Sequence, residues 1–240
     1  MILSQMEDVM CETKETFEFS WGDNFPKGYG HTSLAYLKHC RGFDCAKNGD
    51  FEAACFVVSK CSKPDRLQNL RKNHPNSFLL PVVNQNLLPL ALAQAINLPI
   101  WCHVYIVDHI QRKALPAIQR LQHRPVFAGY IKENLEYIIV DDIITQGGTI
   151  SALRDFVMAR GGKVVAVTAL AFSIGSHDIA PTKRIVFRLT LKFGHQIHLL
   201  NNAGILKSFE TLTHSQARYL LMFSSVWNIL KKAEEINNNC

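Results

Sequence analysis

One stretch, residues 137–151, constrains the fold of this chain more than any other part of the sequence. In it, four apolar residues lead into two adjacent carboxylates, Asp141 and Asp142, and then into a loop rich in Thr and Gly. An amphipathic pattern follows from Ser151, and a second apolar run covers residues 164–172. This order predicts strand, loop, helix and strand, which is a βαβ unit with parallel buried strands. We therefore expect an α/β fold with the two carboxylates at the carboxyl end of a strand, where open sheets bind ligands.

The loop after the carboxylates has the residue types of a phosphate site. Two hydroxyl groups and two glycines let a phosphate approach the backbone closely, and the start of the next helix favours an anion. Ionised carboxylates only accept hydrogen bonds, so Asp141 and Asp142 suit the vicinal hydroxyls of a ribose. The pattern thus predicts a site for a ribose 5-phosphate group; the alternative is a Gly turn after two solvated acids. The predicted phosphate-binding residues are Thr145, Gln146, Gly147, Gly148 and Thr149.

This stretch resembles the signature with which type I phosphoribosyltransferases bind phosphoribosyl pyrophosphate (PRPP): an apolar strand, two acids, two spacer residues and Thr-x-Gly-Gly-Thr. Gln146 replaces the small residue or Thr that is usual at the loop centre. The sequence contains neither a G-x-x-x-x-G-K-S/T motif nor a G-x-G-x-x-G motif after a strand. This argues against a nucleoside-triphosphate P-loop and against a dinucleotide-binding site. Two further stretches, A-K-N-G-D-F-E-A-A and L-T-x-x-x-A-R-Y-L-L, resemble a group of bacterial phosphoribosyltransferase-like proteins.

The resemblance implies a reaction. A phosphoribosyltransferase replaces the pyrophosphate of PRPP with a nitrogen acceptor, here expected to be a nucleobase or a related heterocycle. Mg²⁺ is the implied cofactor, and Asp141 and Asp142 are expected to hold the ribose hydroxyls directly or through the metal. Two alternatives remain open. One is a non-catalytic sensor of PRPP or nucleotides that regulates a partner, and the other is a hydrolase or phosphorylase acting on a ribosyl nucleotide.

Two other segments are expected to complete the site. Asn84, Gln85 and Asn86 follow an apolar run that predicts a strand, and they take the position of the family's pyrophosphate loop, which usually carries a Gly and often a basic residue. The alternative for them is a polar connection without a ligand. Arg112 and Lys113 lie in a long charged insertion, residues 108–136, where the family has a loop that closes over pyrophosphate. The alternative for Arg112 and Lys113, and for Arg120 and Arg124 behind them, is a solvated surface helix.

The rest of the sequence predicts helical segments around an α/β core. We expect a mainly helical segment over residues 1–75, a phosphoribosyltransferase-like core over 76–178 and a mainly helical segment over 179–240. Either terminal segment is a candidate for the hood that covers the acceptor in type I enzymes. Residues 185–193 fit both a helix and an alternating strand. Residues 127–129 are expected to form a short strand that pairs across the base of the charged insertion.

Composition limits the classes of partner and compartment. The 240 residues carry a net charge of +6, which suits an anionic ligand, but no helix-turn-helix signature supports nucleic-acid binding. The seven Cys residues are odd in number and form no C-x-x-C pair, so free thiols in the reducing cytoplasm are expected. No signal peptide and no apolar run of about 20 residues is recognisable, so no membrane partner is expected. The family analogy adds a homodimer as an expectation.

Overall fold

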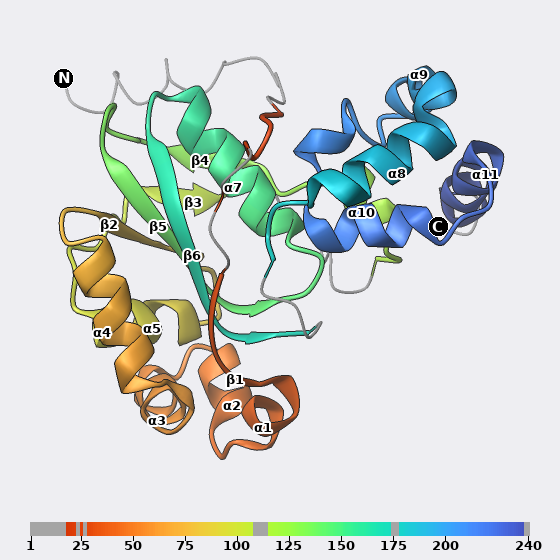
Figure 1. Ribbon diagram of the computed structural model, residues 1–240. Helices are drawn as coiled ribbons and strands as arrows, with labels where there is room; N and C mark the ends of the chain where they lie inside the picture. Colours follow the sequence, from red (N-terminus) through yellow and green to blue (C-terminus); the bar gives the residue numbers. More distant parts are fainter. Residues whose placement is uncertain (1–17, 23–24, 26–27, 108–114, 174–177, 238–240) are drawn as a thin grey trace, which may run out of the picture.

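A four-stranded parallel sheet forms the centre of the protein (Figure 1). The computed structural model describes residues 18–22, 25, 28–107, 115–173 and 178–237. The sheet has the strand order β1-β6-β5-β2, and each neighbouring pair is parallel. Its strands are β1 (Tyr29–Ser33), β2 (Phe78–Pro81), β5 (Glu136–Ile144) and β6 (Lys163–Phe172). Residues 137–140 and 166–171 are buried almost throughout, as expected for parallel strands covered on both faces.

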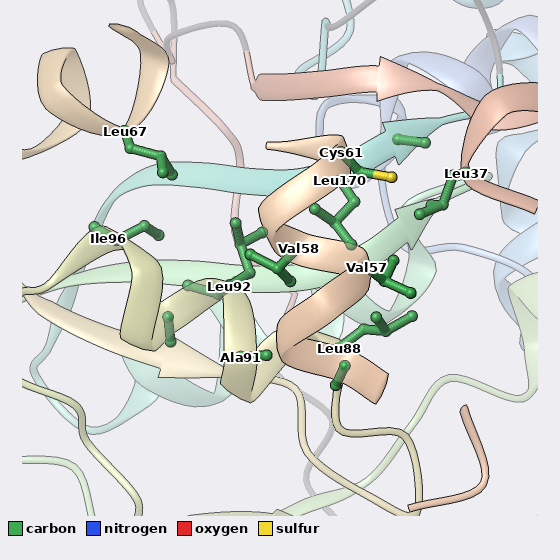
Figure 2. Packing of buried hydrophobic residues seen from close by; sticks show 14 of the residues in the cluster. Leu37, Val57, Val58, Cys61, Leu67, Leu88, Ala91, Leu92, Ile96 and Leu170 are labelled. Atoms are coloured by element: carbon green, nitrogen blue, oxygen red, sulfur yellow. The ribbon is translucent and has the colours of Figure 1, made fainter. Parts of the chain in front are cut away.

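The first face of the sheet is covered by helices from the N-terminal half of the chain. Leu170 of β6 packs in one cluster with Val57 and Leu92 (Figure 2). Ile138 and Val140 of β5 belong to the same cluster. Each fully buried side chain of this size contributes about 1.5–3 kcal/mol to folding. The helices that supply this face are α1 (Leu34–His39), α2 (Phe43–Lys47), α3 (Phe51–Cys61), α4 (Pro64–Asn73) and α5 (Leu88–Ile96).

The second face packs against α7 (Gly148–Ala159). Tyr137 and Ile139 alternate with the residues of the first cluster, as a strand requires, and contact a second cluster that contains Leu153 and Phe156 of α7. A small antiparallel sheet of β3 (Val104–Ile106) and β4 (Phe127–Gly129) lies on the same side. Helices thus flank a parallel sheet on both faces, which confirms the predicted α/β class.

The last part of the chain forms a helical lobe with its own core. Leu189, Leu200 and Leu220 are fully buried there, together with Ile118 and Leu121 from the insertion before β4. Figure 1 shows this lobe beside the sheet. Its helices are α6 (Gln119–Gln122), α8 (Lys183–Phe193), α9 (Ile197–Asn202), α10 (His214–Leu221) and α11 (Val226–Asn237), with the 3-10 turns η2 (Gly194–Gln196) and η3 (Phe209–Thr211).

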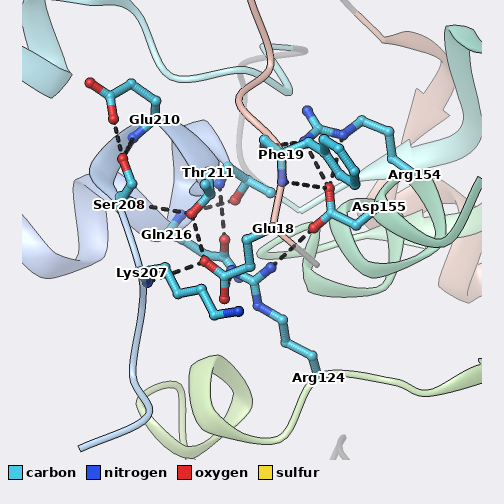
Figure 3. Close-up of polar contacts among 11 residues, drawn as sticks. Glu18, Phe19, Arg124, Arg154, Asp155, Lys207, Ser208, Glu210, Thr211 and Gln216 are labelled. Atoms are coloured by element: carbon cyan, nitrogen blue, oxygen red, sulfur yellow. Dashed lines mark hydrogen bonds and ion pairs between the residues drawn. The ribbon is translucent and has the colours of Figure 1, made fainter. Parts of the chain in front are cut away.

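A short N-terminal segment connects the lobe to the sheet layer (Figure 3). The Glu18 carboxylate accepts hydrogen bonds from the Lys207 backbone N–H at 3.2 Å and from the Thr211 hydroxyl at 2.9 Å. The next residue, Phe19, donates its backbone N–H to Asp155 on α7 at 3.3 Å. Glu18 and Phe19 therefore join the helical lobe to α7, the helix that follows the Thr-Gly loop (residues 145–149).

Two elements differ from the sequence prediction, and a third takes one of the two conformations that the sequence left open. Residues 29–33, which lie in the segment expected to be mainly helical, form an edge strand because they pair in parallel with β6; the His31 ring is buried there and lies 3.1 Å from the Thr168 hydroxyl. The apolar run 100–107 predicts a further strand of the core sheet, but residues 104–106 pair antiparallel with β4, and Ile100 forms an isolated bridge to Leu79 of β2. Residues 185–193 belong to a helix, since Leu189 and Phe193 share its buried face.

Three other expectations have different outcomes. The short strand predicted at 127–129 is confirmed as β4. The domain boundaries after residues 75 and 178, and the hood, remain predictions. Within the described ranges, no helix is both long enough and apolar enough to cross a membrane.

Candidate functional site

The two carboxylates lie within β5 and are almost completely buried. Asp141 is 9% exposed and Asp142 is 6% exposed. The backbone N–H of Asp142 donates to Oδ1 of Asp141 at 2.9 Å, and Ala169 of β6 lies beside Asp141 in the sheet. The strand continues to Ile144, so the carboxylates precede its end by two to three residues rather than following it.

Burial and the neighbouring carboxylate act together on the pKa of Asp141. Burial first, and then the negative charge of Asp142, raises the pKa of Asp141 well above its usual range, while the positive charge of Lys47 opposes the rise. The Asp141 carboxyl therefore keeps its proton to a higher pH than an exposed Asp. A cation or a hydrogen-bond donor that enters the site would favour its ionised form.

Lys47 belongs to the site, although the sequence analysis did not select it. Its ammonium group forms an ion pair with Oδ2 of Asp142, and the two side chains are only 18% and 8% exposed. Lys47 is the last residue of α2, whose residues Phe43 and Ala46 are buried in the first cluster. The one available signal was its place in the A-K-N-G-D stretch, which gave no indication that its side chain reaches β5.

The Thr-Gly loop leads directly into the N-terminus of α7. Gly147 is the N-cap of this helix with a φ of +75°, a conformation that favours glycine. Among the described residues, no side chain caps the helix by a hydrogen bond. Its first backbone N–H groups thus keep the capacity to bind an anion, with the positive end of the helix dipole behind them. Thr145 is exposed at the start of the loop.

The start of α10 supports the other side of this loop. The Thr213 hydroxyl donates to the backbone carbonyl of Gln146, and Thr213 also forms a capping box with Gln216. A Cβ atom on Gly147 would lie 3.0 Å from Cγ2 of Thr213, so the packing is close. The cavity left between them, which Ser215 also lines, measures about 10 Å³, room for about one water. A phosphate on the first N–H groups of α7 must therefore lie outside it.

The segment Asn84–Asn86 lies beside the carboxylates. The N–H of Val82, two residues earlier, donates to the carbonyl of Val140 at 2.9 Å, immediately before Asp141. Asn84 accepts from the Asn86 N–H at 2.8 Å, and Asn86 accepts from the Leu88 N–H at 3.2 Å. The Asn86 side chain is buried and shapes the turn into α5, whereas those of Asn84 and Gln85 are exposed.

The predicted basic residues have different positions. Arg112 and Lys113 lie outside the described residues. Arg120 donates its Nε to the Leu115 carbonyl at 2.9 Å. Arg124 lies near α7, where it forms ion pairs with Asp155 at 3.4 Å and with Glu18 at 3.6 Å. Arg124 therefore links the N-terminal segment to α7 through these two ion pairs.

The donor set for a metal consists of the two β5 carboxylates. Over the described part of the chain, no three His, Cys, Asp or Glu side chains gather as a ready-made metal site. Mg²⁺ commonly binds one or two carboxylates and takes its other ligands from substrate phosphates and water. Asp141 and Asp142 fit that pattern, so a magnesium ion would be held together with a phosphate-bearing ligand rather than by the protein alone.

Comparisons with known proteins identify no family. No protein-family model matches the sequence. The chain is 27% identical over 217 residues to "Protein TraN" from Escherichia coli, which covers 86% of this chain and 48% of that protein. It is 26% identical over 161 residues to an uncharacterized protein from Haemophilus influenzae, over 62% of this chain and 36% of the relative. The chain thus spans half or less of the length of these curated relatives.

Among solved structures, the similar ones include phosphoribosyltransferases at low identity. A purine phosphoribosyltransferase from Pyrococcus horikoshii is 13% identical with a TM-score of 0.34, over 49% of this chain and 81% of that one. Adenine phosphoribosyltransferase from Saccharomyces cerevisiae is 18% identical with a TM-score of 0.32, over 48% of this chain and 72% of that one. Values this low carry no argument about activity, and the α/β assignment rests on the sheet itself.

Proposed function

We propose that this protein binds PRPP with Mg²⁺ and transfers its ribose 5-phosphate group to a nitrogen acceptor, with release of pyrophosphate. One observation carries the proposal: two buried adjacent carboxylates on β5 stand immediately before an α7 N-terminus that no described side chain caps. The carboxylates offer acceptors for a ribose diol, and the helix start offers donors for a 5-phosphate. The Thr-x-Gly-Gly-Thr pattern in the sequence of the loop also indicates a ligand with a ribose 5-phosphate group.

In this reaction the protein mainly orients the bound PRPP and stabilises the leaving pyrophosphate. Asp141 and Asp142 would bind the ribose hydroxyls, and residues 145–149 would fix the phosphate at the opposite end of the sugar. Mg²⁺, held by the same carboxylates and by ligand oxygens, would offset the charge of the leaving pyrophosphate. A nucleobase or related heterocycle is the proposed acceptor.

Calorimetry with PRPP in the presence and absence of Mg²⁺ tests the binding step. The wild-type protein should bind PRPP more tightly with Mg²⁺, and the double variant Asp141→Asn, Asp142→Asn should lose binding because it removes both charged acceptors. Glu136→Gln is the matched control, since Glu136 lies on the same strand but forms an exposed pair with Lys163. Undiminished binding by the double variant would exclude this site.

A non-catalytic sensor is the second candidate function. The observation that favours it is the segment 84–86, which carries no basic side chain and uses Asn86 to shape the turn into α5. Pyrophosphate release, measured with PRPP and a panel of nucleobases, separates the two functions. Release with one base supports the transferase, whereas PRPP binding without release from any base supports the sensor.

A further inference from the structure

The C-terminal end of α2 is fixed against the sheet. Ala46 is completely buried and Phe43 nearly so, which anchors the helix in the first cluster. A tight turn follows at Gly49, whose φ is +98°, and Asp50 begins α3 by accepting a hydrogen bond from Ala53 at 2.9 Å. The backbone of Lys47 is therefore held in place, while its four-carbon side chain can change direction.

The same helix end touches the segment that follows β2. The carbonyl of Ala46 accepts a hydrogen bond from the Leu87 N–H at 3.2 Å, and a Cβ atom on Gly49 would lie 3.6 Å from the Gln85 carbonyl oxygen. The residues just before this segment run beside β5 as far as Val140. Lys47, Asp142 and residues 84–86 consequently share one edge of the site.

A polyanionic ligand can bind at this edge only beside a positive charge. Asp141 and Asp142 are buried and adjacent, and an ionised carboxylate there would repel the anionic group of such a ligand. Lys47 already forms an ion pair with Asp142. Its ammonium group has three N–H donors, and the contact with one carboxylate oxygen does not use all of them. The remaining donors can reach a second anion beside Asp142 without loss of the pair.

We propose that Lys47 binds the pyrophosphate group of PRPP, so that α2 and residues 84–86 together form the pyrophosphate subsite. In this arrangement α2 provides the positive charge that residues 84–86 lack. This inference rests on the proposed function, because it assumes that PRPP binds with its ribose at Asp141 and Asp142.

Calorimetric titration of two ligands tests the assignment, since ribose 5-phosphate lacks the pyrophosphate of PRPP. Lys47→Met should weaken PRPP binding about ten- to a hundred-fold, the usual range for one charged hydrogen bond. The loss of ribose 5-phosphate affinity, which Lys47 affects only through its pair with Asp142, should be much smaller, and Lys47→Arg, which keeps the charge, should restore most of the PRPP affinity. Circular dichroism melting curves check that each variant is folded.

Lys60→Met is the matched control. Lys60 lies 5.7 Å from the ring of Phe56, four residues earlier on α3, just as Lys47 lies 5.6 Å from the ring of Phe43, but no described carboxylate pairs with it. Its variant should bind both ligands like the wild type. Equal losses for PRPP and ribose 5-phosphate in Lys47→Met, or no loss for either, would overturn the subsite. Failure of the wild type to bind either ligand would instead refute the proposed function itself.

Discussion

Two buried aspartates in this protein show how surroundings decide the effect of a charge. Burial is the largest cause that raises the pKa of both Asp141 and Asp155. Asp155, however, contacts two guanidinium groups, Arg154 at 2.8 Å and Arg124 at 3.4 Å. Asp141 has a second carboxylate beside it. We therefore expect the neutral amide to have opposite effects at the two positions.

Replacement of Asp141 by Asn should stabilise the unliganded protein at neutral pH. The folded state holds the Asp141 proton more tightly than the unfolded state, so the wild type loses stability as the pH rises above the ordinary value of 3.8. The variant avoids this loss, and its midpoint of thermal unfolding should exceed that of the wild type by several degrees. The gain should shrink as the pH falls toward 3.8. Melting curves between pH 4 and 8 measure it, and a gain independent of pH would contradict the explanation.

Replacement of Asp155 by Asn should destabilise the protein. It would leave the buried guanidinium group of Arg154 without its carboxylate, which typically costs about 3–5 kcal/mol, while Arg124 would keep its ion pair with Glu18. Urea unfolding measures the change in free energy. Lys163→Met is the comparison, because it breaks an exposed pair with Glu136 and should cost less than about 1 kcal/mol. Similar losses for the two variants would show that the Asp155 network contributes little.

At the scale of elements, the junction of α7 and α10 joins two helix starts. Gly147 begins α7 without a described side-chain cap, and Thr213 begins α10 with a complete capping box. The hydroxyl of Thr213 also bonds to the carbonyl of Gln146, one residue before Gly147. The C-terminal lobe thereby fixes the backbone of the predicted phosphate loop.

Thr213→Val should therefore affect both stability and ligand binding. Loss of the cap should cost about 1–2 kcal/mol, and loss of the bond to Gln146 should weaken ribose 5-phosphate binding. Thr182→Val is the control, because the Thr182 side chain also caps a helix of the lobe, α8 at the Ile185 N–H, but does not line the cavity beside the loop. Urea unfolding and calorimetry measure the two effects. Equal ligand affinities for the two variants would show that α10 does not order the loop.

The elements also show what the sequence could predict. The β5-α7-β6 unit was predictable because long apolar strands and an amphipathic helix have distinct periods and a Gly-rich turn between them. β1 was not, because five residues that include Gly30 and His31 have no strand pattern apart from their partner β6. Lys47 was also missed, since its contact with Asp142 joins residues 95 positions apart.

At the scale of the whole molecule, the described residues form three hydrophobic clusters, which correspond to the two faces of the sheet and the C-terminal lobe. The candidate site draws on all three regions: Lys47 comes from the first face, Gly147 from the start of α7 and Thr213 from the lobe. The sequence predicted that the carboxylates and the Thr-Gly loop lie together, because one continuous segment, residues 137–151, carries both. The contributions of α2 and α10 depend on tertiary packing, which no local pattern encodes.

The N-terminal segment has a consequence for how the protein folds. Its bonds from Glu18 to Lys207 and Thr211 close loops of 189 and 193 residues. Contacts between such distant residues pay a large loop-closure entropy and form slowly. During synthesis, Glu18 can form these bonds only after Lys207 and Thr211 have been synthesised, when most of the chain described here has left the ribosome. The lobe that fixes the Thr-Gly loop should therefore dock late, after the sheet and its first layer of helices have formed.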